Sequence, residues 1–195
     1  MIRSMKFSLL QALLVVFLSV ADRVAWADEN QIDFENGDAL WKGWSATVTN
    51  AGEKSMYRQL PNWETPFSFT YDNEKPQEGS ASLKWDFNGE VPGMVSLRAP
   101  SLPISGKEVL ISFYVRTKGE VGEGLFCVDE TSSTGQRAKA HWAASKIPAS
   151  DDWVEVTWQG PLDPGTASIR LGFVYKAIPA GSCIWIDHVS MKSTP

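Results

Sequence analysis

The chain has 195 residues, of which 43% are hydrophobic, and it carries a formal net charge of −5 at neutral pH. This length fits one domain that can bury a sizeable core. Because binding to phosphate groups depends on focused positive charge, an acidic chain without a Lys/Arg run is not expected to bind nucleic acid or anionic lipid.

The N-terminal segment has the pattern of a signal peptide. Arg3 and Lys6 precede or border an apolar-rich run at residues 7–20 that contains no charge. As a helix this run would rise only ~21 Å, which is shorter than the ~30 Å hydrocarbon core of a membrane. A permanent membrane anchor is therefore not expected.

A cleavage signal follows this run. The small-x-small motif Ala25-Trp26-Ala27 is the kind that signal peptidase recognises. We therefore predict a signal peptide at residues 1–27, cleaved after Ala27, and a single mature domain at residues 28–195. The protein is expected to be secreted or periplasmic, without membrane contact once the signal is removed.

The mature chain is predicted to be almost entirely β-structure. Short β-branched and aromatic runs are separated by Gly, Pro, Asn and Asp, and helical spacing is nearly absent. This spacing predicts an all-β fold, a two-sheet antiparallel β-sandwich or jelly roll. In chain order, the predicted strands are residues 32–35, 45–49, 68–72, 81–87, 94–98, 109–117, 125–130, 153–159, 168–175 and 183–191.

Alternation within the strands indicates which residues face the core. In the strand at 81–87, Leu83, Trp85 and Phe87 share one face, and Ser82, Lys84 and Asp86 share the other. Trp85 is therefore predicted to be buried.

Two connections are long for a compact sandwich, at residues 50–67 and 131–150. The first contains Tyr57 and Trp63, and the second contains Arg137, His141 and Trp142. Long loops often carry function, although their aromatic residues can also simply pin a loop to the body of the domain.

Cys127 and Cys183 form an even pair in a chain predicted to be exported, where a disulfide can persist. A bridge between them and two buried free thiols both stay open, because the sequence does not give their separation. The scattered Cys and His residues have no zinc-site spacing.

Several motifs, taken in order, resemble a known family. The chain opens with Asp33-Phe34-Glu35-Asn36-Gly37, continues with Glu78-Gly79-Ser80-Ala81-Ser82-Leu83-Lys84 and Val109 to Arg116, and closes with Ile184-Trp185-Ile186-Asp187-His188-Val189-Ser190-Met191. Together they resemble the jelly-roll carbohydrate-binding modules of families 4, 9 and 22, which are galactose-binding-like β-sandwiches. The resemblance covers nearly the whole mature chain.

The resemblance implies a structural calcium ion where the first and last strands meet. The implied ligands are Glu35, Asp187 and the turn at Glu78, with Asp33 added by proximity, and calcium does prefer six to eight oxygen ligands. His188 stands where the family often has a second Asp. The alternative is that these carboxylates only join strand ends through hydrogen bonds.

The resemblance also implies binding of a polysaccharide or oligosaccharide through aromatic platforms and flanking polar groups. Trp44, Trp85, Trp153 and Trp185 fall at family positions or core-facing positions and are interpreted as structural. The candidate binding residues are the platforms Trp63, Trp142, Tyr57 and Tyr71 and the polar residues Arg137, Gln136, Glu130 and Asp72.

Catalysis is not expected, because no nucleophile elbow, zinc-protease motif or phosphate-binding Gly loop is present. Glycosidases need two carboxylates across one site, whereas Asp129 and Glu130 are adjacent in a strand and point to opposite faces. A pair from distant strands, such as Asp72 with Glu130, stays open, and with it a small jelly-roll hydrolase or lyase. A second alternative is a secreted protein-interaction sandwich that has lost sugar binding.

Overall fold

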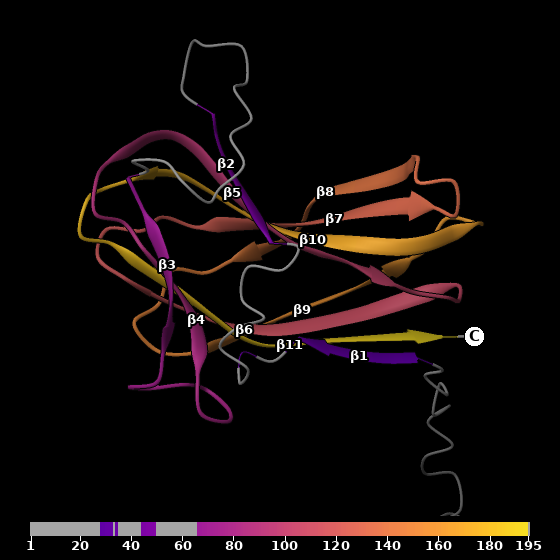
Figure 1. Ribbon diagram of the computed structural model, residues 1–195, viewed down its shortest axis with the longest axis horizontal. Helices are drawn as coiled ribbons and strands as arrows, with labels where there is room; N and C mark the ends of the chain where they lie inside the picture. Colours follow the sequence, from indigo (N-terminus) through magenta and orange to yellow (C-terminus); the bar gives the residue numbers. More distant parts are fainter. Residues whose placement is uncertain (1–27, 33, 35–43, 50–65, 195) are drawn as a thin grey trace, which may run out of the picture.

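The computed structural model describes residues 28–32, 34, 44–49 and 66–194, and the side chains of residues 28–30 are not described. The described part is all-β, and its strands form two antiparallel sheets (Figure 1). The predicted fold class is therefore confirmed. Residues 1–27, the predicted signal peptide, lie outside the described residues. No helix in the described ranges is long and apolar enough to cross a membrane.

The first sheet has six strands and contains the C-terminal strand β11 at its centre. The order is β3-β4-β11-β6-β9, and β1 also pairs with β11. Their bounds are β1 Asp28–Ile32, β3 Ser68–Asp72, β4 Ser82–Asp86, β6 Glu108–Lys118, β9 Val154–Pro161 and β11 Cys183–Thr194.

Strand β11 has different partners along its length. Residues 183–186 pair with β4, and residues 189–193 pair with β1. Both segments also pair with β6, with a register shift between Asp187 and Ser190. The bulge therefore lies where β11 exchanges β4 for β1.

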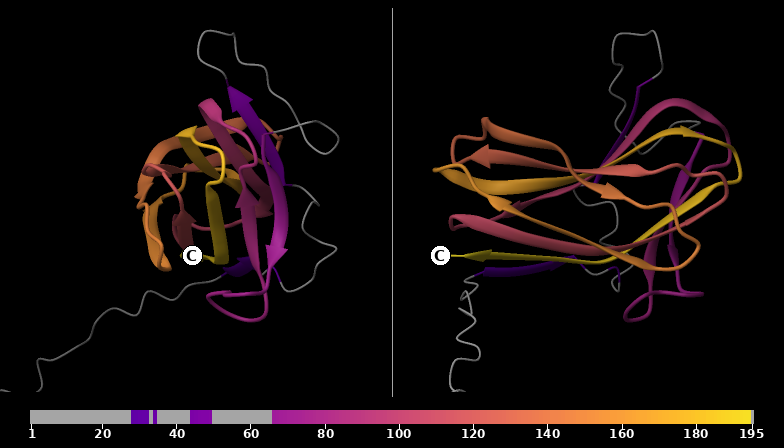
Figure 2. Two further views of the ribbon diagram at one scale, coloured as in Figure 1. Left: turned by 90° about the vertical axis from the view of Figure 1, so that its left-hand side faces the viewer. Right: turned by 180° about the vertical axis from the view of Figure 1, so that it is seen from behind.

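The second sheet has five strands in the order β2-β5-β10-β7-β8. Figure 2 shows the two sheets from one end and from behind. The bounds are β2 Ser45–Thr49, β5 Val91–Pro103, β7 Gly124–Ser132, β8 Arg137–Ile147 and β10 Thr166–Ile178.

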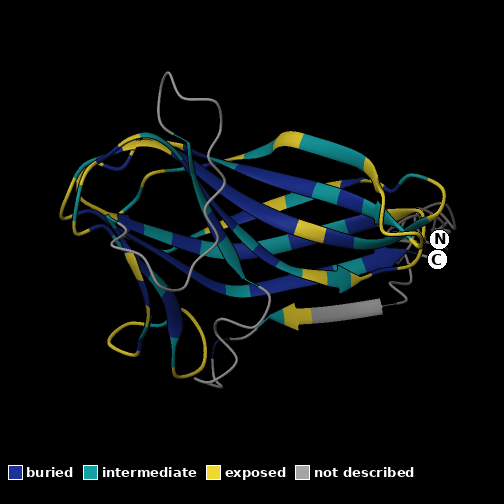
Figure 3. Ribbon diagram, turned by 45° about the horizontal axis from the view of Figure 1, so that its top comes forward, coloured by how far each residue is buried: buried dark blue, intermediate teal, exposed yellow. Residues whose placement is uncertain are grey.

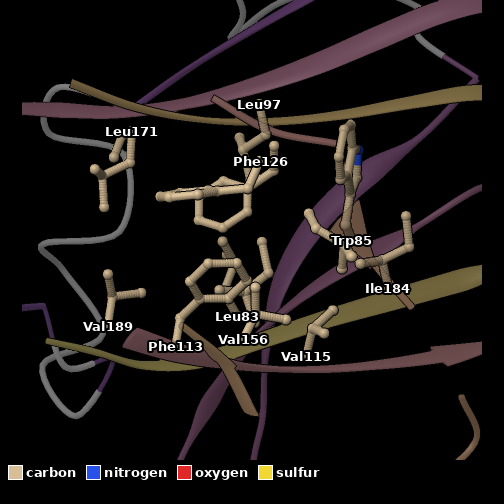
Figure 4. Close-up of a cluster of buried hydrophobic side chains, with 14 of the residues drawn as sticks. Leu83, Trp85, Leu97, Phe113, Val115, Phe126, Val156, Leu171, Ile184 and Val189 are labelled. Atoms are coloured by element: carbon tan, nitrogen blue, oxygen red, sulfur yellow. The ribbon is translucent and has the colours of Figure 1, made fainter. Parts of the chain in front are cut away.

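The hydrophobic core fills the space between the sheets (Figures 3 and 4). Aromatic rings from both layers meet there, with ring centroids of Phe113 4.9 Å from Phe126 and 5.0 Å from Phe173. Trp85 is fully buried, as predicted. Each such side chain stabilises the fold by about 1.5–3 kcal/mol through burial, so the alternating pattern determines which sheet face turns inward.

The sequence-based prediction was wrong about strand β8. Residues 131–150 were predicted to form a long connection, yet residues 137–147 form the edge strand beside β7. Its sequence RAKAHWAASKI lacks the alternating large apolar residues that indicate a strand, and only Ile147 is buried. The strand forms because its backbone completes the hydrogen-bond ladder of β7. Strand β1 spans Asp28–Ile32 and so shares Ile32 with the first predicted strand, whose residues 33 and 35 lie outside the described residues.

Candidate functional site

A groove of about 680 Å³ lies on the outer face of the five-stranded sheet. This volume falls in the range of known small-ligand sites. The described residues that line it come from all five strands and one turn: Ser45, Thr47, Thr49, Met94, Ser96, Arg98, Ser101, Asp129, Thr131, Gly135, Arg137, Trp142, Arg170 and Val174.

Successive side chains of a strand point to opposite faces of the sheet, and this alternation places the polar residues on the outer face. In β5, Val95 and Leu97 are buried in the core, so the neighbouring Arg98 points away from it. In β7, Asp129 lies between the core-facing residues Val128 and Glu130 and therefore points into the groove.

Asp129 is held by two arginines. Arg98 Nη1 donates to Asp129 Oδ2, and Arg137 Nη2 donates to Asp129 Oδ1. The side chains of Arg98 and Asp129 are only 20% and 17% exposed. The three side chains form a charge-assisted hydrogen-bond network across the floor of the groove, and such bonds fix side-chain orientation.

Because Gly172 has no side chain, the Arg98 side chain can extend over it to Asp129. Strand β10 lies between β5 and β7, so Arg98 has to cross it. A Cβ atom built on Gly172 would lie 3.8 Å from the guanidinium carbon of Arg98 and 3.4 Å from Cys127 Cβ. The space that a larger side chain would fill is therefore occupied by the arginine.

Trp142 is presented by a bulge in β8. Phe126 pairs with Ser145 and Val128 with His141, so β8 has two extra residues over this stretch. The neighbouring Ala143 has φ of 54°, a left-handed conformation that is uncommon for a residue with a Cβ. Bulges redirect side chains and often lie beside functional sites.

As a result, Trp142 lies at the wall of the groove with much of its ring in solvent. Its exposure is 55%, and it is the exposed large hydrophobic residue of the described ranges. The guanidinium carbon of Arg98 lies 5.9 Å from the ring centroid, within the range of a cation–π contact. The indole is thus positioned beside the charged network.

Two of the candidate binding residues from the sequence, Trp142 and Arg137, meet in this groove. Gln136 is exposed in the adjoining turn, where its carbonyl oxygen accepts the N–H of Ser132. Tyr57 and Trp63 lie outside the described residues.

Glu130 was wrongly placed among the ligand-binding residues. It is fully buried on the core side of β7. Its carboxylate lies 2.6 Å from His141 Nε2 and accepts hydrogen bonds from the Asp163 N–H at 2.8 Å and the Thr166 hydroxyl at 2.5 Å. Its role is to join β7, β8 and the turn before β10.

Asp72 and Tyr71 belong to the other sheet and do not line the groove that contains Trp142. Asp72 accepts the indole N–H of Trp185 at 2.5 Å and the backbone N–H of Glu74 at 2.9 Å. Burial raises the pKa of Asp72, but these bonds and the nearby positive charges outweigh it and hold the pKa below its usual value. Tyr71 is partly buried against the core.

Sequence reasoning missed Arg98, Asp129 and Arg170 as groove residues. The signal was available in part, because alternation predicts that each points away from the core. Alternation does not show that β5, β10 and β7 are neighbours, and it is this order that brings the three side chains together.

The other sheet carries a smaller hollow of about 350 Å³ that includes Arg116 and Trp185. The guanidinium carbon of Arg116 lies 4.2 Å from the ring centroid of Trp185 and 5.2 Å from that of Trp153. The indole N–H of Trp153 donates to the carbonyl of Lys75. Both indoles are therefore engaged with the protein, which agrees with their structural interpretation.

The described half of the implied calcium set does not fit the cation. Asp187 is 2% exposed, and its Oδ2 accepts backbone N–H groups of Gln77 at 2.7 Å and Glu78 at 3.2 Å, while Oδ1 accepts the N–H of His188 at 2.8 Å. Calcium needs converging oxygen ligands, whereas here N–H donors converge on the carboxylate. Burial raises the pKa of Asp187 above its usual value, although the three N–H bonds act in the opposite direction.

Glu78 is also engaged differently from a metal ligand. Its Oε2 lies 2.8 Å from His188 Nδ1, which in turn lies 3.3 Å from Gln31 Nε2. No group of three or more ligating side chains is found in the described ranges. Glu35 and Asp33 lie outside those ranges, so the calcium site stays a prediction.

The two cysteines are buried free thiols, so the disulfide is not present and the alternative holds. Cys127 lies in β7 of one sheet and Cys183 begins β11 of the other. Burial raises the pKa of both thiols, which makes them less reactive.

Comparison with solved structures places the fold. The chain is similar to the CBM22-1 xylan-binding domain from Paenibacillus barcinonensis Xyn10C, with a TM-score of 0.53 and 18% identity over 86% of this chain and 95% of that one. It is also similar to TmCBM61, solved with β-1,4-galactotriose, with a TM-score of 0.52 and 10% identity over 82% and 92% of the two chains. This chain shares the β-sandwich fold of these two modules.

This β-sandwich also occurs within larger proteins. The enzymatically active domain of tailspike protein 4 from bacteriophage CBA120 matches with a TM-score of 0.57 and 14% identity over 81% of this chain, and this chain spans 20% of its length. No known protein family and no curated protein matches the sequence. At these identities the carbohydrate-binding-module likeness establishes the fold.

Proposed function

We propose that this protein binds polysaccharide or oligosaccharide, without catalysis, in the groove on the outer face of the five-stranded sheet. The observation that carries the proposal is the exposed indole of Trp142 beside the fixed Arg98, Asp129 and Arg137 network. We also propose that it acts outside the cytoplasm, which the signal-peptide pattern of residues 1–27 supports.

The chemistry of the groove suits a sugar. The face of an indole can pack against the C–H face of a pyranose ring, which excludes water from apolar surface. Arginine N–H groups, a carboxylate and the surrounding Ser and Thr hydroxyls supply hydrogen-bond partners for sugar hydroxyls. Two proteins of the same fold are described as xylan-binding and as bound to a galactotriose, which supports the same class of ligand here.

A hydrolase is less well supported. Glycoside hydrolysis uses two carboxylates that flank the bond. Asp129 is the carboxylate among the described lining residues, and the adjacent Glu130 points into the core. Asp72 is in the other sheet, so the distant pair left open by the sequence is not assembled.

A protein-contact surface is also less well supported. Such surfaces present a contiguous apolar patch at their centre. Within the described residues, Trp142 is the exposed large apolar side chain, and ten of the 14 residues that line the groove carry a hydroxyl or a charged group.

The test is binding of the purified protein to a panel of soluble polysaccharides. Affinity electrophoresis and tryptophan fluorescence measure the binding. Trp142→Ala should weaken binding by about tenfold or more, which corresponds to about 1.4 kcal/mol of binding free energy. Trp142→Phe should retain part of it, because an aromatic face is kept.

Trp153→Ala is the matched control, since this indole lies on the other sheet against Arg116. It should bind glycan like the wild-type protein. Absence of binding to every glycan, or equal binding by Trp142→Ala and wild type, would contradict the proposal and favour the protein-contact alternative.

A further inference from the structure

The groove holds more positive than negative charge. Three arginines line it, Arg98, Arg137 and Arg170, and among the described lining residues Asp129 is the single acidic side chain. This balance is opposite to that of the chain, whose net charge is −5. A local positive site in an acidic protein concentrates the field where a ligand would enter.

Asp129 cannot neutralise all three arginines. Its two oxygens already accept hydrogen bonds from Arg98 and Arg137. A single carboxylate offsets one of the three positive charges, so two remain. Arg137 is 53% exposed, so part of its guanidinium faces solvent and is available to a ligand.

Arg170 is the lining arginine that takes no part in the hydrogen-bond network of Arg98, Asp129 and Arg137. It pairs through its backbone with Asp129 of β7 on one side and Ser101 of β5 on the other, so it lies at the centre of the sheet. Its side chain is exposed, and no hydrogen bond or ion pair joins it to another residue of the described ranges. Neighbouring positive charges raise the cost of leaving it without a counter-ion.

We propose that the groove selects anionic glycans, with Arg170 and Arg137 binding a carboxylate or sulfate group on a sugar whose ring packs on Trp142. This inference rests on the proposed sugar binding and adds the charge of the ligand. Guanidinium groups match the planar geometry of a carboxylate and can also bind sulfate oxygens with paired hydrogen bonds. Ser and Thr hydroxyls of β2 and β5 remain for the neutral hydroxyls of the glycan.

The experiment compares pairs of polymers that share a sugar backbone, one of each pair carrying acidic groups and the other neutral. Polygalacturonate is measured against its methyl-esterified form, and dextran sulfate against dextran, at low and at moderate salt. The acidic form of at least one pair should bind about tenfold or more tightly than its neutral partner, and salt should reduce this difference. Preference within the first pair identifies a carboxylate ligand, and preference within the second identifies a sulfate ligand.

Arg170→Gln should reduce the affinity for the acidic form by about threefold to tenfold and leave neutral glycans unaffected. Because Arg170 is exposed, folding should be unchanged, which circular dichroism and thermal unfolding can check. Lys176→Gln removes one charge from the same strand at an exposed residue that does not line the groove, so it should bind like wild type.

The outcomes separate the two proposals. Equal affinity for the acidic and neutral forms, or an Arg170→Gln variant that binds like wild type, overturns the anionic inference. If binding of neutral glycans still depends on Trp142, the proposed sugar site stands. Acidic polymers that bind equally well to the Trp142→Ala variant would show attraction to any polyanion, and both proposals would then fail.

Discussion

At position 172, the absence of a side chain lets one arginine bridge three strands. Arg98 starts on β5, crosses β10 above Gly172 and reaches Asp129 on β7. A Cβ atom at this position would be in ordinary contact with the guanidinium, whereas the branches of a larger residue would occupy its place. The geometry of the groove therefore depends on a residue that makes no polar contact through a side chain.

Gly172→Val should displace Arg98 and weaken glycan binding by about fivefold to tenfold. Strand stability should not suffer, because valine suits a strand better than glycine does. Gly172→Ala is the matched control and should bind nearly as well as wild type. Glycan titration by calorimetry, together with thermal unfolding, measures both effects. A valine variant with wild-type affinity would show that the Arg98 bridge is not needed for binding.

Among the elements, β8 shows why part of the site could not be predicted. Its sequence mixes Ala, Lys and Arg with one Trp, so neither helical nor strand periodicity is visible. The strand is held by the ladder to β7, a tertiary interaction that local sequence does not encode. Trp142 and Arg137 were selected because they fall in a predicted long loop, and both line the groove.

The bulge in β11 is the second element with a consequence that can be measured. There the Asp187 carboxylate accepts three backbone N–H groups and joins the interior of β11 to the turn before β4, while His188 contacts Glu78 and Gln31. This bonding satisfies the buried carboxylate without a cation.

The described residues alone predict the same thermal midpoint in EDTA and in millimolar calcium, whereas the calcium site implied by the sequence predicts a higher midpoint in calcium. A differential scanning calorimetry run in each buffer measures this, with magnesium as the control for general ionic effects. A rise of several degrees that is specific to calcium would contradict the first of these expectations. Such a rise would support the predicted calcium site, with Glu35 and Asp33 as further ligands.

At the scale of the whole molecule, the sandwich followed from features that local sequence does carry. Alternation at Leu83, Trp85 and Phe87 gave the buried face, and the ordered motifs from Phe34 to Asp187 gave the fold. The groove depends instead on which strands are neighbours. Asp129 and Glu130 point to opposite faces, as alternation predicts, but Asp129 meets Arg98 because β10 and β5 lie beside β7, which alternation does not show.

The sheet order also gathers charge that the sequence disperses. Arg98, Arg137 and Arg170 are far apart in the chain, so no basic run is visible. Strands β5, β8 and β10 bring them to one face of a sandwich whose overall charge is negative. The sequence therefore did not reveal that positive charge is concentrated in the groove.

The most direct test is a nuclear magnetic resonance titration of the purified protein with the glycan that binds best. Saturable backbone amide shifts should concentrate on the five-stranded sheet, at Arg98, Asp129 and Gly172, and the indole N–H of Trp142 should shift with them. Shifts centred instead on Trp153 and Trp185 of the six-stranded sheet, or no saturable shifts, would contradict glycan binding in this groove.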